Sequence, residues 1–154
     1  MKQLLKLALL VSIIVSCNSK EKKSTKVEYP EKTSMTQKDS KLDASIERGK
    51  SVYNDMCITC HLADGKGVPK AFPPLADSDY LKEKQKESIV GIKNGMSGEM
   101  VVNGITYNSV MAPLGLSNEE VADVMNYINN SWGNDYGKPI TAKDVENALK
   151  NSSN

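Results

Sequence analysis

A strong charge of one sign is missing from this sequence of 154 residues, and aromatic side chains are scarce. Its 20 Lys and Arg residues nearly balance 19 Asp and Glu residues, which leaves a formal net charge of +1. That balance argues against a nucleic-acid-binding protein. One Phe and one Trp build only a modest hydrophobic core, and small domains with such cores often depend on a cofactor or a covalent cross-link.

Long hydrophobic runs are missing as well, and the longest one stands at the N-terminus. Two lysines precede an apolar run from Leu7 to Val15, which is shorter than the roughly 20 residues that a membrane-spanning helix needs. Ser16 and Cys17 follow this run. A basic start, a short apolar stretch and a small residue are typical of an export signal, so residues 1–16 are predicted to be a signal peptide.

The letters IVSC, which end at Cys17, resemble the lipobox of bacterial lipoproteins. In that motif, cleavage occurs just before the cysteine and its sulfur receives a diacylglycerol. The resemblance implies an exported lipoprotein that Cys17 anchors to a membrane, facing the bacterial periplasm. The alternative is an ordinary signal peptide with an incidental cysteine. With Cys17 used as the anchor, Cys57 and Cys60 are the remaining pair in an oxidising compartment, where thiols must be protected or used.

Residues 17–44 are expected to carry the lipid and form a flexible tether. The letters from Asn18 to Lys41 are mostly Lys, Glu, Ser and Thr. A solvated surface helix is the weaker alternative, because no apolar stripe recurs among them at helical spacing. After this segment, a helix capped by Asp43 or Ser45 is expected to lead directly into Cys57.

Local patterns predict several further elements. A loop rich in Gly and Pro follows residue 61, and one or two short helices then end at Gly95. Asn103-Gly104 predicts a small hairpin or a tight loop. Ser117 and Glu120 form a capping box that starts an amphipathic helix. In the tail, residues 137–154, one short helix capped by Thr141 is expected.

The stretch DMCITCH places two cysteines and the single histidine, Cys57, Cys60 and His61, within five positions. A structural zinc site is disfavoured, because a carboxylate would have to supply its fourth ligand. A thioredoxin-type dithiol needs its first cysteine at the start of a helix that follows a strand, whereas here a helix precedes the motif. Covalent haem suits the motif best, because two cysteines can bond the porphyrin while the adjacent histidine binds its iron.

The chain from Ile46 to about Asn134 resembles a class I, single-haem cytochrome c. Gly49 and Tyr53 precede the first motif cysteine by eight and four residues, as do the family's glycine and aromatic residue that pack against the last helix. Val124 and Tyr127 stand at the matching positions of that last helix. The first and last helices are therefore expected to cross, with Gly49 permitting their close approach.

The resemblance implies an all-α fold over residues 45–136, with three to five helices around one haem c and room for a minor β-hairpin. The haem is expected to be bound covalently through Cys57 and Cys60. In the letters FPPLA, the resemblance implies that the Pro73 carbonyl accepts the Nδ1 hydrogen of His61 and that Leu75 lies against the porphyrin.

The second axial ligand has to be chosen among the four methionines that follow the motif. A buried methionine is more often adaptable core filler than a ligand. Met125 falls on the apolar face of the last predicted helix, and Met96 and Met100 stand beside the hairpin. Met111 stands in an irregular loop before that helix, where the family keeps its ligand, although Ala112 separates it from the proline that commonly follows directly. The resemblance thus implies axial ligation by the histidine and Met111.

Two filled axial positions leave none for a substrate, so the resemblance implies electron transfer without enzymatic chemistry. The expected partners are redox proteins that meet the carrier near a membrane. Eight basic and twelve acidic residues in 45–136 give that segment a net charge of −4, which predicts a docking face with less lysine than in mitochondrial-type cytochromes. Two alternatives stay open: a haem c subunit of a larger oxidoreductase, and a five-coordinate haem enzyme or gas sensor.

Overall fold

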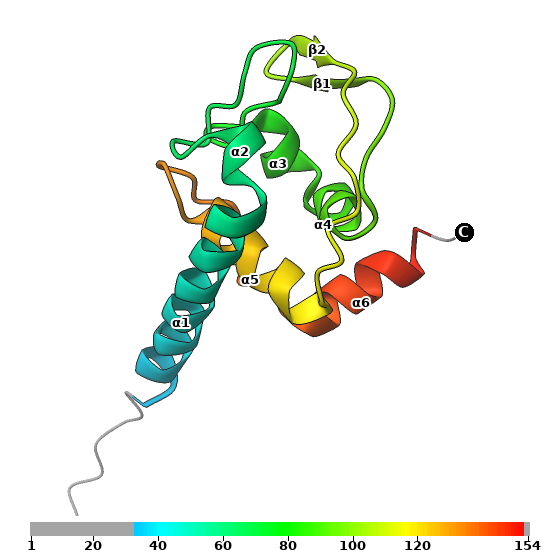
Figure 1. Cartoon of the computed structure of the whole chain (residues 1–154). Helices are drawn as coiled ribbons and strands as arrows, with labels where there is room; N and C mark the ends of the chain where they lie inside the picture. Colours follow the sequence, from blue (N-terminus) through cyan, green and yellow to red (C-terminus); the bar gives the residue numbers. More distant parts are fainter. Residues whose placement is uncertain (1–32, 153–154) are drawn as a thin grey trace, which may run out of the picture. The chain divides into compact units, whose positions relative to one another are not determined.

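The computed structural model describes residues 33–152, with side chains from residue 40 onward (Figure 1). The predicted signal peptide, Cys17 and the first part of the expected tether lie outside these residues. Across the described residues, no helix combines the length and the apolar character needed to cross a membrane. The elements are α1 (Thr33–Met56), α2 (Ile58–His61), α3 (Asp79–Glu83), α4 (Gln85–Asn94), β1 (Met100–Val102), β2 (Ile105–Tyr107), α5 (Asn118–Asn129) and α6 (Ala142–Lys150).

The mostly helical fold is confirmed: the described residues of 45–136 contain five helices, α1 to α5, within the expected three to five, and α6 is the short helix predicted for the tail. Helix α2 is a single turn that carries the second cysteine and the histidine. The hairpin is also confirmed: β1 and β2 pair in antiparallel fashion, with Val102 opposite Ile105. Asn103 and Gly104 both have positive φ angles, 50° and 74°, as a two-residue turn of this hand requires.

Helix α1 begins earlier than expected. Its first residue is Thr33, so Asp43 and Ser45 lie inside the helix and the predicted cap is wrong. The stretch 33–44 of the expected tether is therefore helical. It contains no Gly or Pro. A helix that is already held by packing farther along extends through such a stretch at little cost, because nucleation is the expensive step.

Helices α1 and α5 cross at Gly49, as expected. A Cβ atom added to Gly49 would lie 1.9 Å from the Asp123 carbonyl oxygen and 2.9 Å from the Tyr127 Cβ, so only glycine allows this approach. Tyr53 and Val124 are buried at the same crossing. The rings of Tyr53 and Tyr127 pack with their centroids 5.3 Å apart.

A polar cluster that the sequence did not reveal reinforces this crossing. Asp123, which is 7% exposed, accepts hydrogen bonds from Ser45 Oγ at 2.6 Å and from Arg48 Nε and Nη2 at 2.6 and 2.7 Å. Asn126 donates to Ser45 Oγ and to the Ile140 carbonyl, and its Oδ1 accepts from the Ile140 N–H at 2.8 Å. The cluster therefore links α1, α5 and the tail.

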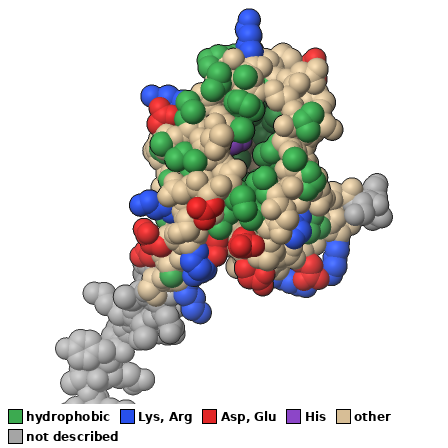
Figure 2. All heavy atoms as spheres, in the orientation of Figure 1, with side chains coloured by type: hydrophobic (Ala, Val, Ile, Leu, Met, Phe, Trp, Pro, Cys, Tyr) green, Lys and Arg blue, Asp and Glu red, His purple; other side chains and the backbone are tan. Residues whose placement is uncertain are grey.

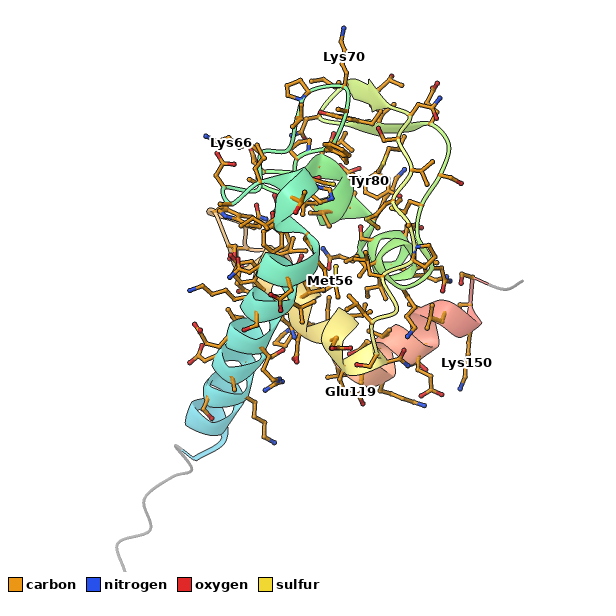
Figure 3. The ribbon with its side chains drawn as sticks, in the orientation of Figure 1. Met56, Lys66, Lys70, Tyr80, Glu119 and Lys150 are labelled. Carbon is orange, nitrogen blue, oxygen red and sulfur yellow. The ribbon has the colours of Figure 1, made fainter. Side chains whose placement is uncertain are left out.

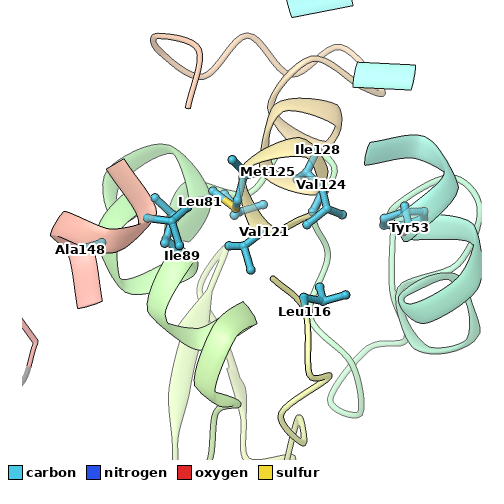
Figure 4. Packing of buried hydrophobic residues seen from close by; sticks show 11 residues of the cluster. Tyr53, Leu81, Ile89, Leu116, Val121, Val124, Met125, Ile128 and Ala148 are labelled. Atoms are coloured by element: carbon cyan, nitrogen blue, oxygen red, sulfur yellow. The ribbon is translucent and has the colours of Figure 1, made fainter. Parts of the chain in front are cut away.

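The hydrophobic core lies around α5 and includes residues from α1, α3, α4 and α6 (Figure 4). The predicted capping box of Ser117 and Glu120 is present at the start of α5. Thr141 caps α6, also as predicted, and does so in a second box with Asp144. Val145 and Ala148 of α6 are buried in the core. The tail therefore packs into the domain through α6.

Candidate haem-binding site

An apolar cavity opens between α2 with its following loop and the segment that runs from the hairpin to α5 (Figure 2). Among the described residues, no Asp, Glu, Lys or Arg side chain lines it. Met56 at the end of α1 and Tyr80 on α3 lie on its wall (Figure 3). Its other apolar lining includes Phe72, Pro74, Leu75, Leu81, Ile92, Met96, Met100, Val102, Tyr107, Leu114 and Ile128.

The two motif cysteines reach this cavity from a turn that continues α1. The Cys57 N–H donates to the Tyr53 carbonyl at 2.9 Å, and the N–H groups of Cys60 and His61 both donate to the Cys57 carbonyl. All three motif side chains line the cavity. Burial, followed by the nearby Cys60, raises the pKa of the Cys57 thiol to about 11. A redox dithiol shows the opposite shift, so the structure disfavours the thioredoxin-type alternative.

His61 is held in place by one hydrogen bond. Its Nδ1 lies 2.9 Å from the Pro73 carbonyl oxygen, the contact that the resemblance implied. Burial lowers the pKa of His61, and the Pro73 carbonyl opposes this shift. A neutral imidazole whose Nδ1–H is donated to a carbonyl keeps Nε2 as the nitrogen with a free lone pair, which is the form that binds a metal.

The loop after the motif brings Pro73 to the histidine through a glycine. Gly67 has a φ of +61°, and a Cβ atom there would lie 2.3 Å from the Phe72 carbonyl oxygen and 2.6 Å from that of Pro73. A larger residue at this position would push the Pro73 carbonyl away. Leu75, the other predicted contact of the loop, lines the cavity, and its N–H donates to the Gly65 carbonyl at 2.7 Å.

The structure brings three of the four candidate methionines to the cavity. Met96, Met100 and Met111 line it, whereas Met125 is fully buried in the core and does not. The sulfur of Met96 packs against α4, because it lies 2.4 Å from where a Cβ atom of Gly91 would stand. The backbones of Met96 and Met111 exchange two hydrogen bonds, at 2.8 and 2.9 Å, which fix the Met111 backbone at the cavity.

Trp132, which the sequence did not single out, packs with two tyrosines next to the cysteine motif. The ring of Trp132, after α5, lies with its centroid 5.2 Å from that of Tyr53 and 5.6 Å from that of Tyr127. Its Nε1 donates to the Ala63 carbonyl at 3.0 Å, and the Tyr53 hydroxyl donates to the Leu62 carbonyl at 2.7 Å. These bonds fix the chain just after His61. The only sequence signal was that Trp132 is the single tryptophan.

The chemistry of the cavity suits haem better than a bare metal ion. Among the side chains that the structure describes, from residue 40 to 152, His, Cys, Asp and Glu nowhere gather in a group of three that could hold a metal ion. The cavity instead offers a long apolar lining, two thiols and a neutral imidazole, with thioethers on other parts of its wall. Fold and site together define a small helical protein that binds haem covalently, which is the class of the single-haem c-type cytochromes.

Comparisons with known proteins agree with that class. The family model described as "Cytochrome c" matches residues 46–132. The chain is 37% identical over 107 residues to cytochrome c-552 of Thermus thermophilus. The matched region covers 64% of this chain and 81% of that protein. The chain belongs to the cytochrome c family. It therefore carries haem c through the cysteine pair and works in electron transfer.

Cytochrome c subunits of dehydrogenases are also similar to this chain. The cytochrome c subunit of a quinone-dependent alcohol dehydrogenase from Gluconacetobacter polyoxogenes is 34% identical over 100 residues, which covers 63% of this chain and 21% of that subunit. The gluconate 2-dehydrogenase cytochrome c subunit of Pantoea cypripedii is 34% identical over 107 residues, covering 68% of this chain and 24% of the subunit. The similarity therefore extends over about a quarter or less of each subunit.

Proposed function

We propose that the protein is a single-haem electron carrier in which His61 and Met111 occupy both axial positions of the iron. The observation that carries this proposal is the His61 Nδ1 to Pro73 hydrogen bond of 2.9 Å, which orients the imidazole at a cavity that Met111 also lines. The positions of Met96 and Met125 favour Met111 over these two methionines. Met125 is confined to the core, and the Met96 sulfur is packed against Gly91.

When bound, the haem supplies an iron that takes up and gives back one electron. The chain's own residues set the conditions for that exchange. His61 and Met111 would hold the iron and leave no open position on it for a substrate, and a thioether donor favours the reduced state. The Pro73 carbonyl raises the basicity of the imidazole. The apolar lining excludes water and so disfavours the extra positive charge of the oxidised state.

The test of the ligand pair is the visible spectrum of the purified holoprotein with and without Met111. The oxidised wild type should show the weak long-wavelength charge-transfer band of a bond between Met and ferric iron, and Met111→Ala should lose it. Met100→Leu is the matched control, because Met100 lines the same cavity and its loss should leave the band intact. A band that survives in Met111→Ala would contradict the proposal. Ready binding of carbon monoxide by the reduced wild type would instead support a five-coordinate enzyme or sensor.

We further propose that the mature protein begins at a lipidated Cys17, is exported to the bacterial periplasm and stays at the membrane. The support is the N-terminal sequence pattern, with its short apolar run and the letters IVSC. A tether would hold the carrier at high local concentration near its redox partners. Cys17→Ser should move the protein from the membrane fraction to the soluble fraction. An unchanged distribution would contradict the anchor.

A second candidate function is that of a haem c subunit in a larger oxidoreductase. The similarity to cytochrome c subunits of dehydrogenases favours it. Mild detergent extraction followed by size-exclusion chromatography separates the two cases. A free carrier should elute near its own mass, whereas a subunit should elute together with a dehydrogenase activity.

A further inference from the structure

One hydrogen bond joins the two loops that hold the proposed axial ligands. The Ser109 hydroxyl donates to the Ala71 carbonyl, across 38 positions of sequence. Ala71 stands two residues before Pro73, the partner of His61, and Ser109 stands two residues before Met111. We propose that Ser109 is a positioning residue that keeps the Met111 thioether on the iron by tying its loop to the histidine side. This inference rests on the proposed ligation by His61 and Met111.

The acceptor of this bond belongs to a rigid turn. Val68 and Phe72 exchange two backbone hydrogen bonds of 2.8 Å, and the Ala71 N–H donates to the Val68 carbonyl at 3.0 Å. The same turn continues into Pro73, whose carbonyl is bonded to His61. The Ala71 carbonyl is therefore a fixed point within the histidine-side loop, and a loop attached to it is held relative to the imidazole.

The donor belongs to a segment that is held at few points. Asn108 and Val110 are exposed, and the Val110 side chain is 75% accessible. Among the described residues of 108–110, Ser109 alone takes part in a hydrogen bond. After this segment, Met111 is fixed through its backbone to Met96. The Ser109 hydroxyl thus provides the fixed point on the N-terminal side of Met111, and the Met96 pairing holds Met111 itself.

Loss of the hydroxyl should release the methionine loop on one side. The thioether then leaves the ferric iron more often, because the loop gains conformations in which Met111 is displaced. A typical net contribution of one hydrogen bond changes such an equilibrium by about five-fold. Free imidazole binds the iron when the thioether is away, so its apparent affinity rises in proportion to the released fraction.

The experiment is an imidazole titration of the oxidised holoprotein, followed by its spectrum. Ser109→Thr and Ser109→Val form the key pair, because their side chains have similar shapes and only threonine keeps the hydroxyl. We expect Ser109→Thr to bind imidazole as the wild type does, and Ser109→Val to bind it about five-fold more tightly. Ser97→Ala is the matched control: Ser97 is exposed, follows Met96 directly and should leave the affinity unchanged.

Met111→Ala, measured in parallel, separates the two proposals. If this variant keeps the charge-transfer band, the ligand assignment fails, and the role of Ser109 fails with it. If Met111→Ala loses the band but Ser109→Val and Ser109→Thr bind imidazole equally tightly, Met111 stands as the ligand and only the role of Ser109 is overturned. Equal haem content in all variants confirms that the comparison is made on folded protein.

Discussion

At Gly49 and Gly67, the close approach of two backbone segments depends on a single residue. Both positions lie where a Cβ atom would meet a backbone carbonyl oxygen, from Asp123 at Gly49 and from Phe72 at Gly67. Gly49 was singled out by its spacing from the motif, through the family resemblance. The need for glycine at Gly67 appears only in the structure, because it depends on how the loop returns to His61. The same limit applies to the contacts of Trp132 with Tyr53 and Ala63, which lie far away in sequence.

Gly49→Ala should destabilise the protein by about 2 kcal/mol or more, because a methyl group forced into a packed contact displaces the helices around it. The measurement is denaturant-induced unfolding of the holoprotein. Ser51→Ala is a suitable control, since Ser51 is exposed on the same helix. Should Gly49→Ala and wild type unfold at the same denaturant concentration, the close crossing of α1 and α5 would be refuted.

At the scale of elements, the sequence predicts the features that depend on neighbouring residues and does not predict those that depend on distant contacts. The capping box of α5, the Thr141 cap of α6 and the turn of the hairpin involve neighbouring residues, so the local sequence was enough to predict them. The start of α1 was placed too late, because polar composition alone does not separate a tether from a helix supported by packing beyond it. The burial of α6 was also not predicted, since Val145 and Ala148 pack in a core whose other members lie far away in sequence.

Removing the tail after residue 136 should destabilise the domain by about 3 kcal/mol or more. The deletion exposes the site that Val145 occupies and leaves Asn126 without its partners at Ile140, and each loss costs about 1 to 3 kcal/mol. Thermal unfolding of the holoprotein measures the effect. Deleting residues 153–154 alone is the control and should change little. A truncated domain as stable as the full chain would show that α6 is dispensable.

The Asp144 carboxylate in the cap of α6 should make the stability of the protein depend on pH. Hydrogen bonds from the Thr141 hydroxyl and N–H lower the pKa of Asp144 below its ordinary value of 3.8. The stabilisation is therefore complete above that value and is lost as the pH falls through the lower pKa of the folded state. Wild type should exceed Asp144→Asn in unfolding free energy at neutral pH, and the difference should shrink in acid. A difference that stays constant with pH would contradict this.

At the scale of the whole molecule, the domain has a core made of side chains and a cavity lined by apolar groups. The core around α5 meets the cavity at Leu81 and Ile128, and away from the cavity α1, α4 and α6 each pack directly on α5. The loops of residues 57–76 and 96–114 instead surround the cavity. This division follows from a chain with few aromatic residues, which leaves the haem to complete the interior. Composition predicted the need for the cofactor, and the structure places these two segments at its cavity.

A chain without haem should therefore lose order unevenly. In a Cys57→Ser/Cys60→Ser double variant prepared without haem, backbone amides of residues 57–76 and 96–114 should exchange hydrogen much faster than in the holoprotein. Amides in the buried parts of α1 and α5 should stay protected longest. Hydrogen exchange followed by mass spectrometry gives the comparison. Uniform exchange along the chain would contradict a core that holds without the haem.

The length of α1 has a mechanical consequence for how the carrier meets its partners. It is one continuous helix of 24 residues, so its two ends lie about 36 Å apart. One end leads directly into Cys57, and the other, Thr33, is the first described residue. Because α1 also packs on α5, it is a rigid part of the domain. Any rotation of α1 therefore turns the cavity with it, so the direction of this helix sets the direction in which the haem edge faces a redox partner.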